Sequence, residues 1–537
     1  MTDDADSPVA VSGRRFQIAI FSIVAATVLI LNLPTPAGLS VEAHRLIGVT
    51  FLMAALWATQ VVPLAATSLI PLAAFPLFGI MEPKAVSKSY VSDTLFLYLG
   101  GMIIALGIER WQLHRRLALN LVAVAGVSPR RLIFGFLLST AILSMWISNT
   151  ACTLLMLPIA TAMLKTLDDL NRDQSRKRDA GSPLFPTERI AVPLLLSIAY
   201  GASIGGMMTQ VGSPTNSSAM GIYRDMFEAD RDISMSQWMM ACFPIGLIYL
   251  LLTWIVLAFR LPGASHGDIA VRGILRGKLS ELGRPDSAEI RMLIIFLLTG
   301  LLWVFRLPIQ VTDSITIPGW LPEFTRAFNA VSPWYNSSEA KLSSGDVVSD
   351  STIAMSIAIL LFFIPSGHSD PQGRSVPLMT WNTASRLPWD MILLFGGGFA
   401  LADAFEATKL SQWLGTTLQQ PLAGQPVWVV IAALCLMMTF LTEFTSNVAT
   451  VNTVMPTILT MAAPLGIDPR LLFVPVTLAA SCAFMLPIGT PPNAIVFSTG
   501  RVPPTHMAAY GLILNLIGIP ILTLGAIWIL KPVFGIP

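Results

Sequence analysis

The chain has 537 residues, of which 54% are hydrophobic and only 12% are charged, and its mean hydropathy is +0.69. A soluble domain carries about twice that charged fraction, so the composition all but excludes a soluble multidomain enzyme. The net charge of +2 gives no basic bulk field, which argues against a nucleic-acid partner. We therefore predict an all-α polytopic membrane protein with about 11 transmembrane helices of about 20 residues each.

The first predicted elements are a short polar tail and an apolar run. The tail, residues 1–15, ends in Arg14 and Arg15, and the apolar run extends from about Phe16 to Leu33. Basic residues favour the cytoplasmic side of a membrane. We therefore interpret the run as an uncleaved first helix with a cytoplasmic N-terminus, in a protein of the inner (plasma) membrane. Further helices are expected up to residue 92.

Two later parts of the chain resemble each other and predict an internal repeat, with copies at 93–260 and 389–535. Three pairs of motifs support it. The matches are Asp93-Thr-Leu-Phe-Leu-Tyr-Leu-Gly-Gly with Asp390-Met-Ile-Leu-Leu-Phe-Gly-Gly-Gly (offset 297), Ser148-Asn149-Thr150 with Ser446-Asn447-Val448 (offset 298), and Gly212-Ser213-Pro214-Thr215-Asn216 with Gly489-Thr490-Pro491-Pro492-Asn493 (offset 277).

Each copy is expected to hold a re-entrant hairpin followed by a broken helix. The first hairpin, 131–164, is too short for two full spans of about 20 residues each, and the second, 425–465, is expected from its match to the first. The broken helices, 190–222 and 471–499, carry Gly and Pro in mid-run, and these residues leave backbone groups unpaired. A last helix is predicted at 508–530.

The flanking charges predict that the two copies have opposite orientations. Arg130, Arg131 and Lys165 surround the first hairpin, so it enters from the cytoplasm. No Lys or Arg occurs from Ser411 to Pro469, so the second hairpin fits entry from the other side. Such an inverted repeat is typical of secondary transporters.

Between the copies we expect a cytoplasmic linker and additional helices. The linker, 261–289, is rich in Lys and Arg. Helices follow within 290–365, interrupted by a polar insertion at 309–350 that we assign to the outside.

The polar triplets in the hairpins indicate a binding site. Ser, Thr and Asn at membrane depth are costly unless they pair or line a cavity. At the tip of a hairpin they lie beside the free N–H groups of a helix N-terminus, which bind anions. Interhelical hydrogen bonding is the structural alternative, and the repetition in matched positions favours binding.

The absence of basic residues predicts coupling to a cation. No Lys or Arg occurs in 132–164, 190–222, 411–469 or 471–500. Helix N-termini supply only about half a charge each, so a buried dianion would remain uncompensated. Bound Na⁺, held by Ser, Thr, Asn and backbone oxygens, would supply the missing charge. Glu443 is either a structural carboxylate or a participant in ion or proton binding.

These motifs resemble the divalent anion–sodium symporter family, the sodium-coupled dicarboxylate, citrate and sulfate transporters. The resemblance extends over most of the chain from about residue 45, although the tail and the stretch 309–345 show none. Further matching segments are Glu109-Arg110-Trp111-Gln-Leu-His114-Arg115-Arg116, Val348-Ser-Asp-Ser-Thr352, Pro388-Trp389-Asp390 and Thr442-Glu443-Phe444-Thr445. It implies a homodimer whose protomers combine a scaffold domain, including the helices in 16–92 and 290–365, with a mobile transport domain that works as an elevator.

The resemblance also implies particular ligands. The first sodium site would use Ser144, Ser148, Asn149 and the backbone at Gly212, and the second would use Thr442, Thr445, Asn447 and the backbone at Gly489. The substrate carboxylates would contact Ser148, Asn149, Thr150, Ser213, Pro214, Ser446, Asn447, Thr490 and Pro491. Val448 departs from the family pattern, which usually has Thr there, so one substrate hydrogen bond is expected to be lost.

The expected function is sodium-coupled symport of C4-dicarboxylates such as succinate, malate and fumarate, with sodium ions, a dicarboxylate and the lipid bilayer as partners. A sodium-independent dicarboxylate exchanger and a sodium–sulfate or sodium–citrate transporter of the same fold are the alternatives. A membrane-embedded enzyme would need a general base beside its serine, and neither hairpin contains His, Lys or Asp. An open channel fits paired hairpins and broken helices less well than alternating access does.

Overall fold

The computed structural model describes most of the chain. The described residues are 13–126, 128–175, 187–227, 232–259, 261, 268–312, 315–331, 348–410, 412–414 and 424–537. The predicted tail 1–15 lies outside them except for its last three residues. Part of the linker 261–289 and the middle of the insertion 309–350 also lie outside the described residues.

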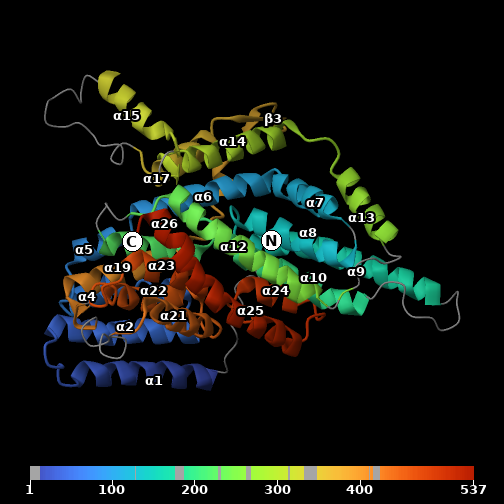
Figure 1. Cartoon of the computed structure of the whole chain (residues 1–537). Coiled ribbons are helices and arrows are strands. Elements are labelled where there is room, and N and C mark those ends of the chain that lie inside the picture. Colours follow the sequence, from blue (N-terminus) through green and yellow to red (C-terminus); the bar gives the residue numbers. More distant parts are fainter. Residues whose placement is uncertain are drawn as a thin grey trace.

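The N-terminal region consists of helices of very different length. Serines cap two of the longer ones, because the Ser40 side chain accepts from Ala43 N and the Ser92 side chain accepts from Leu95 N. The helices are α1 (Gly13–Asn32), α2 (Val41–Thr59), α3 (Leu64–Thr67), α4 (Ile70–Leu77), α5 (Pro83–Ser89), α6 (Asp93–Arg110) and α7 (Leu113–Ala125). Helices α1 and α2 pack together at one edge of the molecule (Figure 1).

The next region holds the first copy of the repeated motifs. Its helices are α8 (Pro129–Ser144), α9 (Asn149–Ser175), α10 (Thr187–Gly206), α11 (Pro214–Met226) and α12 (Met235–Ala258). The chain reverses between α8 and α9 and loses helical structure between α10 and α11. These are the positions of the polar triplet and of the Gly-Ser-Pro motif.

The central region lies at the opposite edge from α1 (Figure 1) and adds two short antiparallel strand pairs. Helix α14 begins with a capping box made by Asp286 and Glu289. The elements are α13 (Asp268–Glu281), α14 (Ser287–Val304), β1 (Ile309–Thr312), β2 (Ile315–Ile317), α15 (Trp320–Val331), α17 (Asp350–Leu360), β3 (Pro365–Ser369), β4 (Ser375–Pro377) and α18 (Trp381–Ala384).

The C-terminal region holds the second copy. Its helices are α19 (Trp389–Ala407), α21 (Val427–Thr442), α22 (Asn447–Thr460), α23 (Pro469–Ala480), α24 (Pro491–Phe497), α25 (Pro504–Gly525), the π-helical turn η3 (Ala526–Leu530) and α26 (Lys531–Phe534). The chain is thus predominantly helical, as predicted, with two small β-hairpins as the departure from an all-α fold.

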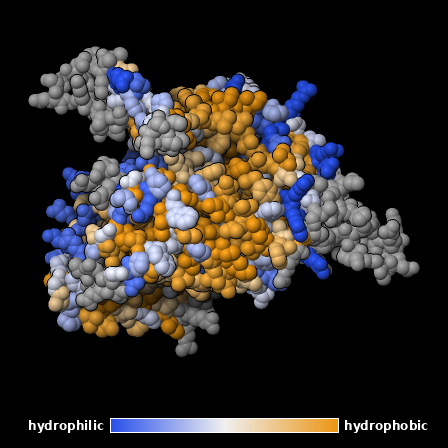
Figure 2. Space-filling model, viewed as in Figure 1, coloured by the Kyte–Doolittle hydropathy of each residue, from blue (hydrophilic) through white to orange (hydrophobic). Residues whose placement is uncertain are grey.

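Among the described residues, seven helices are long and apolar enough to cross a membrane: Val41–Thr59, Pro83–Arg110, Asn149–Asp169, Arg189–Gly206, Met235–Ala258, Ser287–Val304 and Pro504–Phe534. Figure 2 shows a hydrophobic surface over the middle of the helices, with hydrophilic residues towards both ends. Exposed leucines and isoleucines of α12, α14 and α25 belong to the apolar surface of the molecule. Such side chains belong in lipid, so the chain is an integral membrane protein.

The two copies interlock. Helix α9 packs against α24, and α22 packs against α11, so each hairpin contacts the broken helix of the other copy. Helix α10 contacts α8 and α9 of its own copy and α24 of the other. The two hairpins and the two broken helices therefore form one packed unit.

Candidate functional site

The hairpin tips have the same helix boundaries in both copies. Helix α8 ends at Ser144 and α9 begins at Asn149, while α21 ends at Thr442 and α22 begins at Asn447. Both pairs of boundaries are related by the same offset as the two polar triplets. Each tip therefore presents one polar residue at the end of a helix and one Asn at the start of the next.

At the first tip, one terminal atom of the Asn149 carboxamide faces three oxygen atoms: Ser144 Oγ at 2.7 Å, Ala202 O at 3.1 Å and Gly212 O at 3.3 Å. With the carboxamide nitrogen there, Asn149 can donate to these three neighbours. With the carboxamide oxygen there, four oxygens converge and share only the Ser144 hydroxyl proton. A cation would stabilise such a group, so the orientation of this carboxamide decides whether the tip is closed by hydrogen bonds or offers oxygen atoms to a metal ion.

The second tip gathers oxygen atoms in a related way. Thr442 Oγ1 lies 2.6 Å from Asn447 Oδ1 and 3.0 Å from Ala480 O. The Thr442 hydroxyl has one proton for these two acceptors, so this cluster is also poor in protons. Thr442 is buried, and Asn447 is half-buried. In the described residues, no group of three His, Cys, Asp or Glu side chains could hold a metal ion, and oxygen clusters of this kind suit Na⁺.

The breaks in the two long helices are held by asparagines in the same way. Asn216 Nδ2 donates to Gly206 O at 3.0 Å and to Thr209 O at 2.7 Å. Asn493 Nδ2 donates to Ala483 O at 2.9 Å and to Leu486 O at 3.0 Å. The second set repeats the first at the offset of 277 that relates the two Gly-Pro motifs. Asn493 corresponds to Asn216, Ala483 to Gly206, and Leu486 to Thr209. We call the segments 207–213 and 481–490 the first and second hinge, and each hinge is fixed by one such amide clamp.

Glycines bring the hinges close to the hairpin tips. A Cβ atom at Gly212 would lie 2.9 Å from both Ser144 O and Met145 O, which is closer than carbon and oxygen normally approach. In addition, Thr209 Oγ1 donates to Met145 O and accepts from Gly212 N. The first hinge therefore lies directly against the first tip because residue 212 has no side chain.

The remaining predicted residues lie at the ends of the same helices. Ser213 and Thr490 are the N-caps of α11 and α24, and both are buried. Ser148 Oγ accepts from Ala151 N at 3.3 Å, whereas Ser446 makes no side-chain capping bond. Four further residues occupy positions next to these caps: Thr150 and Pro214 are half-buried, Pro491 is exposed, and Val448 is only 5% exposed.

The structure groups some of the predicted sodium ligands and separates one. Ser144, Asn149 and Gly212 come together at the first tip, and Thr442 and Asn447 come together at the second. Thr445 Oγ1 instead bonds to Leu441 O at 3.0 Å and to the Thr450 hydroxyl. No hydrogen bond among the described residues joins Thr445 to Thr442 or Asn447.

Glu443 lies between the second tip and the second hinge. It is 1% exposed, and its carboxylate accepts from Met485 N at 2.8 Å, Leu486 N at 3.0 Å and Asn515 Nδ2 at 2.7 Å. A Cβ at Gly489 would lie 3.1 Å from Glu443 Oε2. The carboxylate therefore holds two backbone N–H groups of the hinge that have lost helical partners.

Sequence reasoning assigned no role to four contributors to the oxygen clusters and the amide clamps. The carbonyls of Ala202 and Ala480 carry no signal in the sequence, because any residue has a carbonyl. Asn216 and Asn493 could have been found, since they end the repeated Gly-Ser-Pro and Gly-Thr-Pro motifs at the same offset as the glycines.

Paired hairpins and helices broken beside buried oxygen clusters define a helical membrane transporter. The chain belongs to the sodium:sulfate symporter family, because residues 16–536 match the family described as the sodium:sulfate symporter transmembrane region. The family resemblance drawn from the motifs is thereby confirmed. The protein is a transporter and not an enzyme.

Relatives match over nearly the whole chain. The sodium-dependent dicarboxylate transporter SdcS of Staphylococcus saprophyticus is 36% identical over 517 residues, which cover 95% of this chain and 90% of that protein. SdcS of Staphylococcus aureus (strain bovine RF122 / ET3-1) is 35% identical over 509 residues, covering 93% and 88%.

Two solved transporters share the fold at much lower sequence identity. The YdaH transporter of Alcanivorax borkumensis aligns with a TM-score of 0.50 and 12% identity, over 96% of this chain and 98% of that one. MtrF of Neisseria gonorrhoeae gives the same score and identity, over 96% and 94%. These two structures support the fold alone.

Proposed function

We propose that this protein is a symporter that carries C4-dicarboxylates such as succinate, malate and fumarate across the membrane together with sodium ions. The observation that carries the proposal is the gathering of side-chain and backbone oxygen atoms at both hairpin tips, each beside an Asn carboxamide. Relatives at 35% and 36% identity bear the name sodium-dependent dicarboxylate transporter, which supports both the ion and the substrate class.

In this proposal, the first sodium ion binds Ser144 Oγ, Asn149 Oδ1 and the carbonyls of Ala202 and Gly212. In the absence of sodium, the Asn149 carboxamide turns over and donates to the same neighbours. The second ion binds Thr442 Oγ1, Asn447 Oδ1 and Ala480 O, near Gly489. Ser148 belongs to the first predicted set, while Thr445, whose hydroxyl bonds to Leu441 O and Thr450, would have to turn to join the second ion.

The substrate carboxylates bind where α9 and α22 begin. Their free backbone N–H groups and partial positive charge favour anions. Three side-chain groups add hydrogen bonds there: the Ser148–Thr150 triplet, the Ser446–Asn447 pair, and the caps Ser213 and Thr490 beside Pro214 and Pro491. No Lys or Arg occurs in these segments, so the bound sodium ions neutralise the dianion and make substrate binding depend on sodium.

Transport then proceeds by an elevator movement of the hairpins and broken helices against the scaffold helices. The crosswise packing of α9 on α24 and of α22 on α11 supports their moving as one body. Trp146 of the first tip stacks on Trp303 of α14, with ring centroids 6.2 Å apart. This contact lines a mostly apolar pocket formed by Gly101, Ile104, Ile108, Trp146, Val211, Phe296, Thr299 and Trp303. Apolar surfaces can slide without breaking ion pairs.

The proposal also includes a homodimer in the inner membrane, a cytoplasmic N-terminus and inverted orientations of the two copies. Arg14, Arg15, Arg130, Arg131 and Lys165 support these orientations through the positive-inside rule.

Uptake of labelled succinate into liposomes that contain the purified protein tests the function. We expect uptake with external sodium, little uptake with potassium, and loss of uptake in Asn149→Ala. Asn120→Ala is the matched control, because it removes the same side chain from an exposed position on α7.

The alternatives give distinct results. Equal uptake in both salts that requires internal dicarboxylate would mean a sodium-independent exchanger. Sodium-driven uptake of sulfate or citrate, without uptake of succinate, would keep the ion sites and replace the substrate. Val448, which lacks the hydroxyl of Thr150, is the residue that favours testing these anions.

A further inference from the structure

The second hinge contains a buried carboxylate that the sodium and substrate sites described above do not use. Glu443 follows Thr442, a proposed sodium ligand, and its Oε2 lies against Gly489, the predicted backbone ligand of the same site. It is 1% exposed. The carboxylate therefore lies between two components of the second cation site.

The hydrogen bonds of Glu443 suit its ionised form. Its three partners, Met485 N, Leu486 N and Asn515 Nδ2, are all N–H donors. An ionised carboxylate only accepts hydrogen bonds, and donors directed at it stabilise the negative charge.

In the part of the chain that the structure describes, no positive side chain pairs with this carboxylate. None of the ion pairs among the described residues includes Glu443. Two buried tyrosines on neighbouring helices donate elsewhere: Tyr200 OH donates to Phe484 O and Tyr249 OH donates to Leu514 O. A buried anion with no counter-ion is costly, and a cation at the adjacent site would remove that cost.

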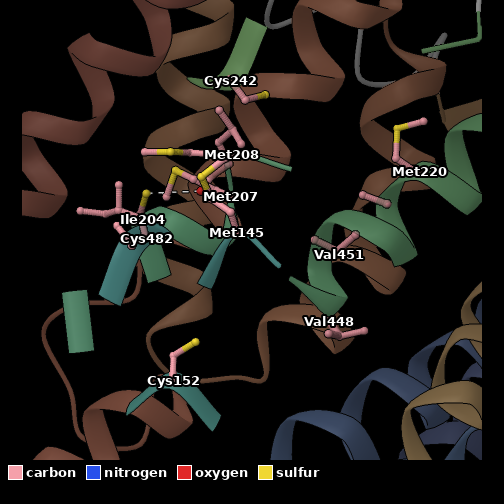
Figure 3. Close-up of a cluster of buried hydrophobic side chains, with 14 of the residues drawn as sticks. Met145, Cys152, Ile204, Met207, Met208, Met220, Cys242, Val448, Val451 and Cys482 are labelled. Atoms are coloured by element: carbon pink, nitrogen blue, oxygen red, sulfur yellow. Dashed lines mark hydrogen bonds between the residues drawn. The ribbon is translucent and has the colours of Figure 1, made fainter. Parts of the chain in front are cut away.

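The first copy has no such charge. At the offset that relates the two hairpin tips, the position equivalent to Glu443 is Met145. Figure 3 shows Met145 among Met207 and Met208 of the first hinge, in a cluster of buried apolar side chains. The hinge beside it is held by the Thr209 hydroxyl instead of a carboxylate. The two sites therefore share an amide clamp and differ in one formal charge.

We propose that the Glu443 carboxylate is a fixed counter-charge for the second cation site and makes that site bind sodium more tightly than the first. The inference rests on the proposed sodium sites and adds an order of affinity to them. Glu443 acts here as a positioning and electrostatic residue, since it touches the hinge rather than the ion. The second site then fills first and fixes the hinge before substrate binds.

The test measures sodium binding without transport. The full-length protein is purified in detergent, and its thermal unfolding midpoint is followed against NaCl at constant ionic strength, because a ligand that binds the folded state raises the midpoint. Asn149→Ala disables the first site and leaves the second intact, whereas Asn447→Ala disables the second and leaves the first intact. Each is compared with and without Glu443→Gln, which removes the charge and keeps the size of the side chain.

We expect Glu443→Gln to raise the half-saturating sodium concentration about tenfold or more on the Asn149→Ala background, as the loss of groups that support the ligands does for other metals. On the Asn447→Ala background the change should stay below about twofold, because the first site lies beside Met145. Met145→Gln on the Asn149→Ala background is the matched control and should leave the sodium dependence of the second site unchanged. Asn515→Ala, which removes a donor but keeps the charge, should weaken binding less than Glu443→Gln.

An unchanged sodium dependence of Asn149→Ala after Glu443→Gln, or an equal weakening on both backgrounds, overturns the inference and leaves the proposed function intact. If the wild-type protein shows no response to sodium, the proposed sodium coupling fails, and the inference fails with it. If Glu443→Gln does not yield folded protein, Glu443→Asp is used in its place. The Asp side chain keeps the negative charge but is one methylene shorter, so the carboxylate lies farther from the hinge. Weaker sodium binding confined to the Asn149→Ala background then supports the inference, and unchanged binding overturns it.

Discussion

The first and second hinges solve one structural problem with different chemistry. In both, an asparagine amide, of Asn216 or of Asn493, bridges two carbonyls where the helix unwinds, and the spacing of the three residues is the same. The first hinge then completes its hydrogen bonds with the neutral Thr209 hydroxyl, whereas the second uses the Glu443 carboxylate. The comparison teaches that the clamp sets the shape of a hinge, while its charge is set separately by one residue of the neighbouring hairpin.

The largest effect should follow from removing the carboxamide of either tip. We expect Asn149→Ala and Asn447→Ala each to lower sodium-driven succinate uptake by about 100-fold, since a lost ion ligand costs about 10–100-fold in affinity and coupling requires both ions. Initial rates in proteoliposomes at a fixed sodium concentration measure it. Near-normal transport by either variant would mean that only one tip binds sodium, and the comparison of two matched sites would then be wrong.

A smaller effect is expected from removing the amide clamps. Asn216→Leu and Asn493→Leu keep roughly the side-chain size but leave two buried carbonyls without donors, each costing about 1–3 kcal/mol. Both variants should unfold at a lower temperature than the wild type. Their transport should fall by about tenfold, one factor of ten for each ~1.4 kcal/mol lost from the productive hinge geometry.

The two clamp variants also separate the hinges. Because Glu443 holds Met485 N and Leu486 N independently of Asn493, Asn493→Leu should lower the unfolding midpoint less than Asn216→Leu. Differential scanning fluorimetry of the two purified variants measures the difference. A larger loss for Asn493→Leu would show that the carboxylate adds charge without holding the hinge.

Much of this arrangement could be predicted from the sequence. The family could be predicted because the polar and Gly-Pro motifs resemble it, and the family match over residues 16–536 confirms that resemblance. Helical structure and membrane insertion follow from hydropathy. The oxygen contributions of Ala202 and Ala480 could not be predicted, since a backbone carbonyl is specified only by the fold around it. The hydrogen bonds of Glu443 also depend on tertiary packing, because Asn515 lies 72 residues away in the chain.

The smallest expected effect concerns the substrate, at the third position of the polar triplets, where the two copies differ in a hydroxyl. Thr150 and Val448 occupy equivalent positions in the two triplets, and Val448 is 5% exposed. Thr150→Val should raise the KM for succinate about three- to tenfold, because one hydrogen bond contributes about 1 kcal/mol. Val448→Thr should lower the KM by a similar factor, as it adds the hydroxyl that the family pattern contains. Neither substitution should change the sodium concentration that gives half-maximal uptake, since both positions lie outside the oxygen clusters. Val448→Thr could instead lower the KM for sulfate or citrate and leave the KM for succinate unchanged. The missing hydroxyl would then determine which anion is carried. The asymmetry of the two tips would in that case concern the choice of substrate in addition to the affinity for sodium.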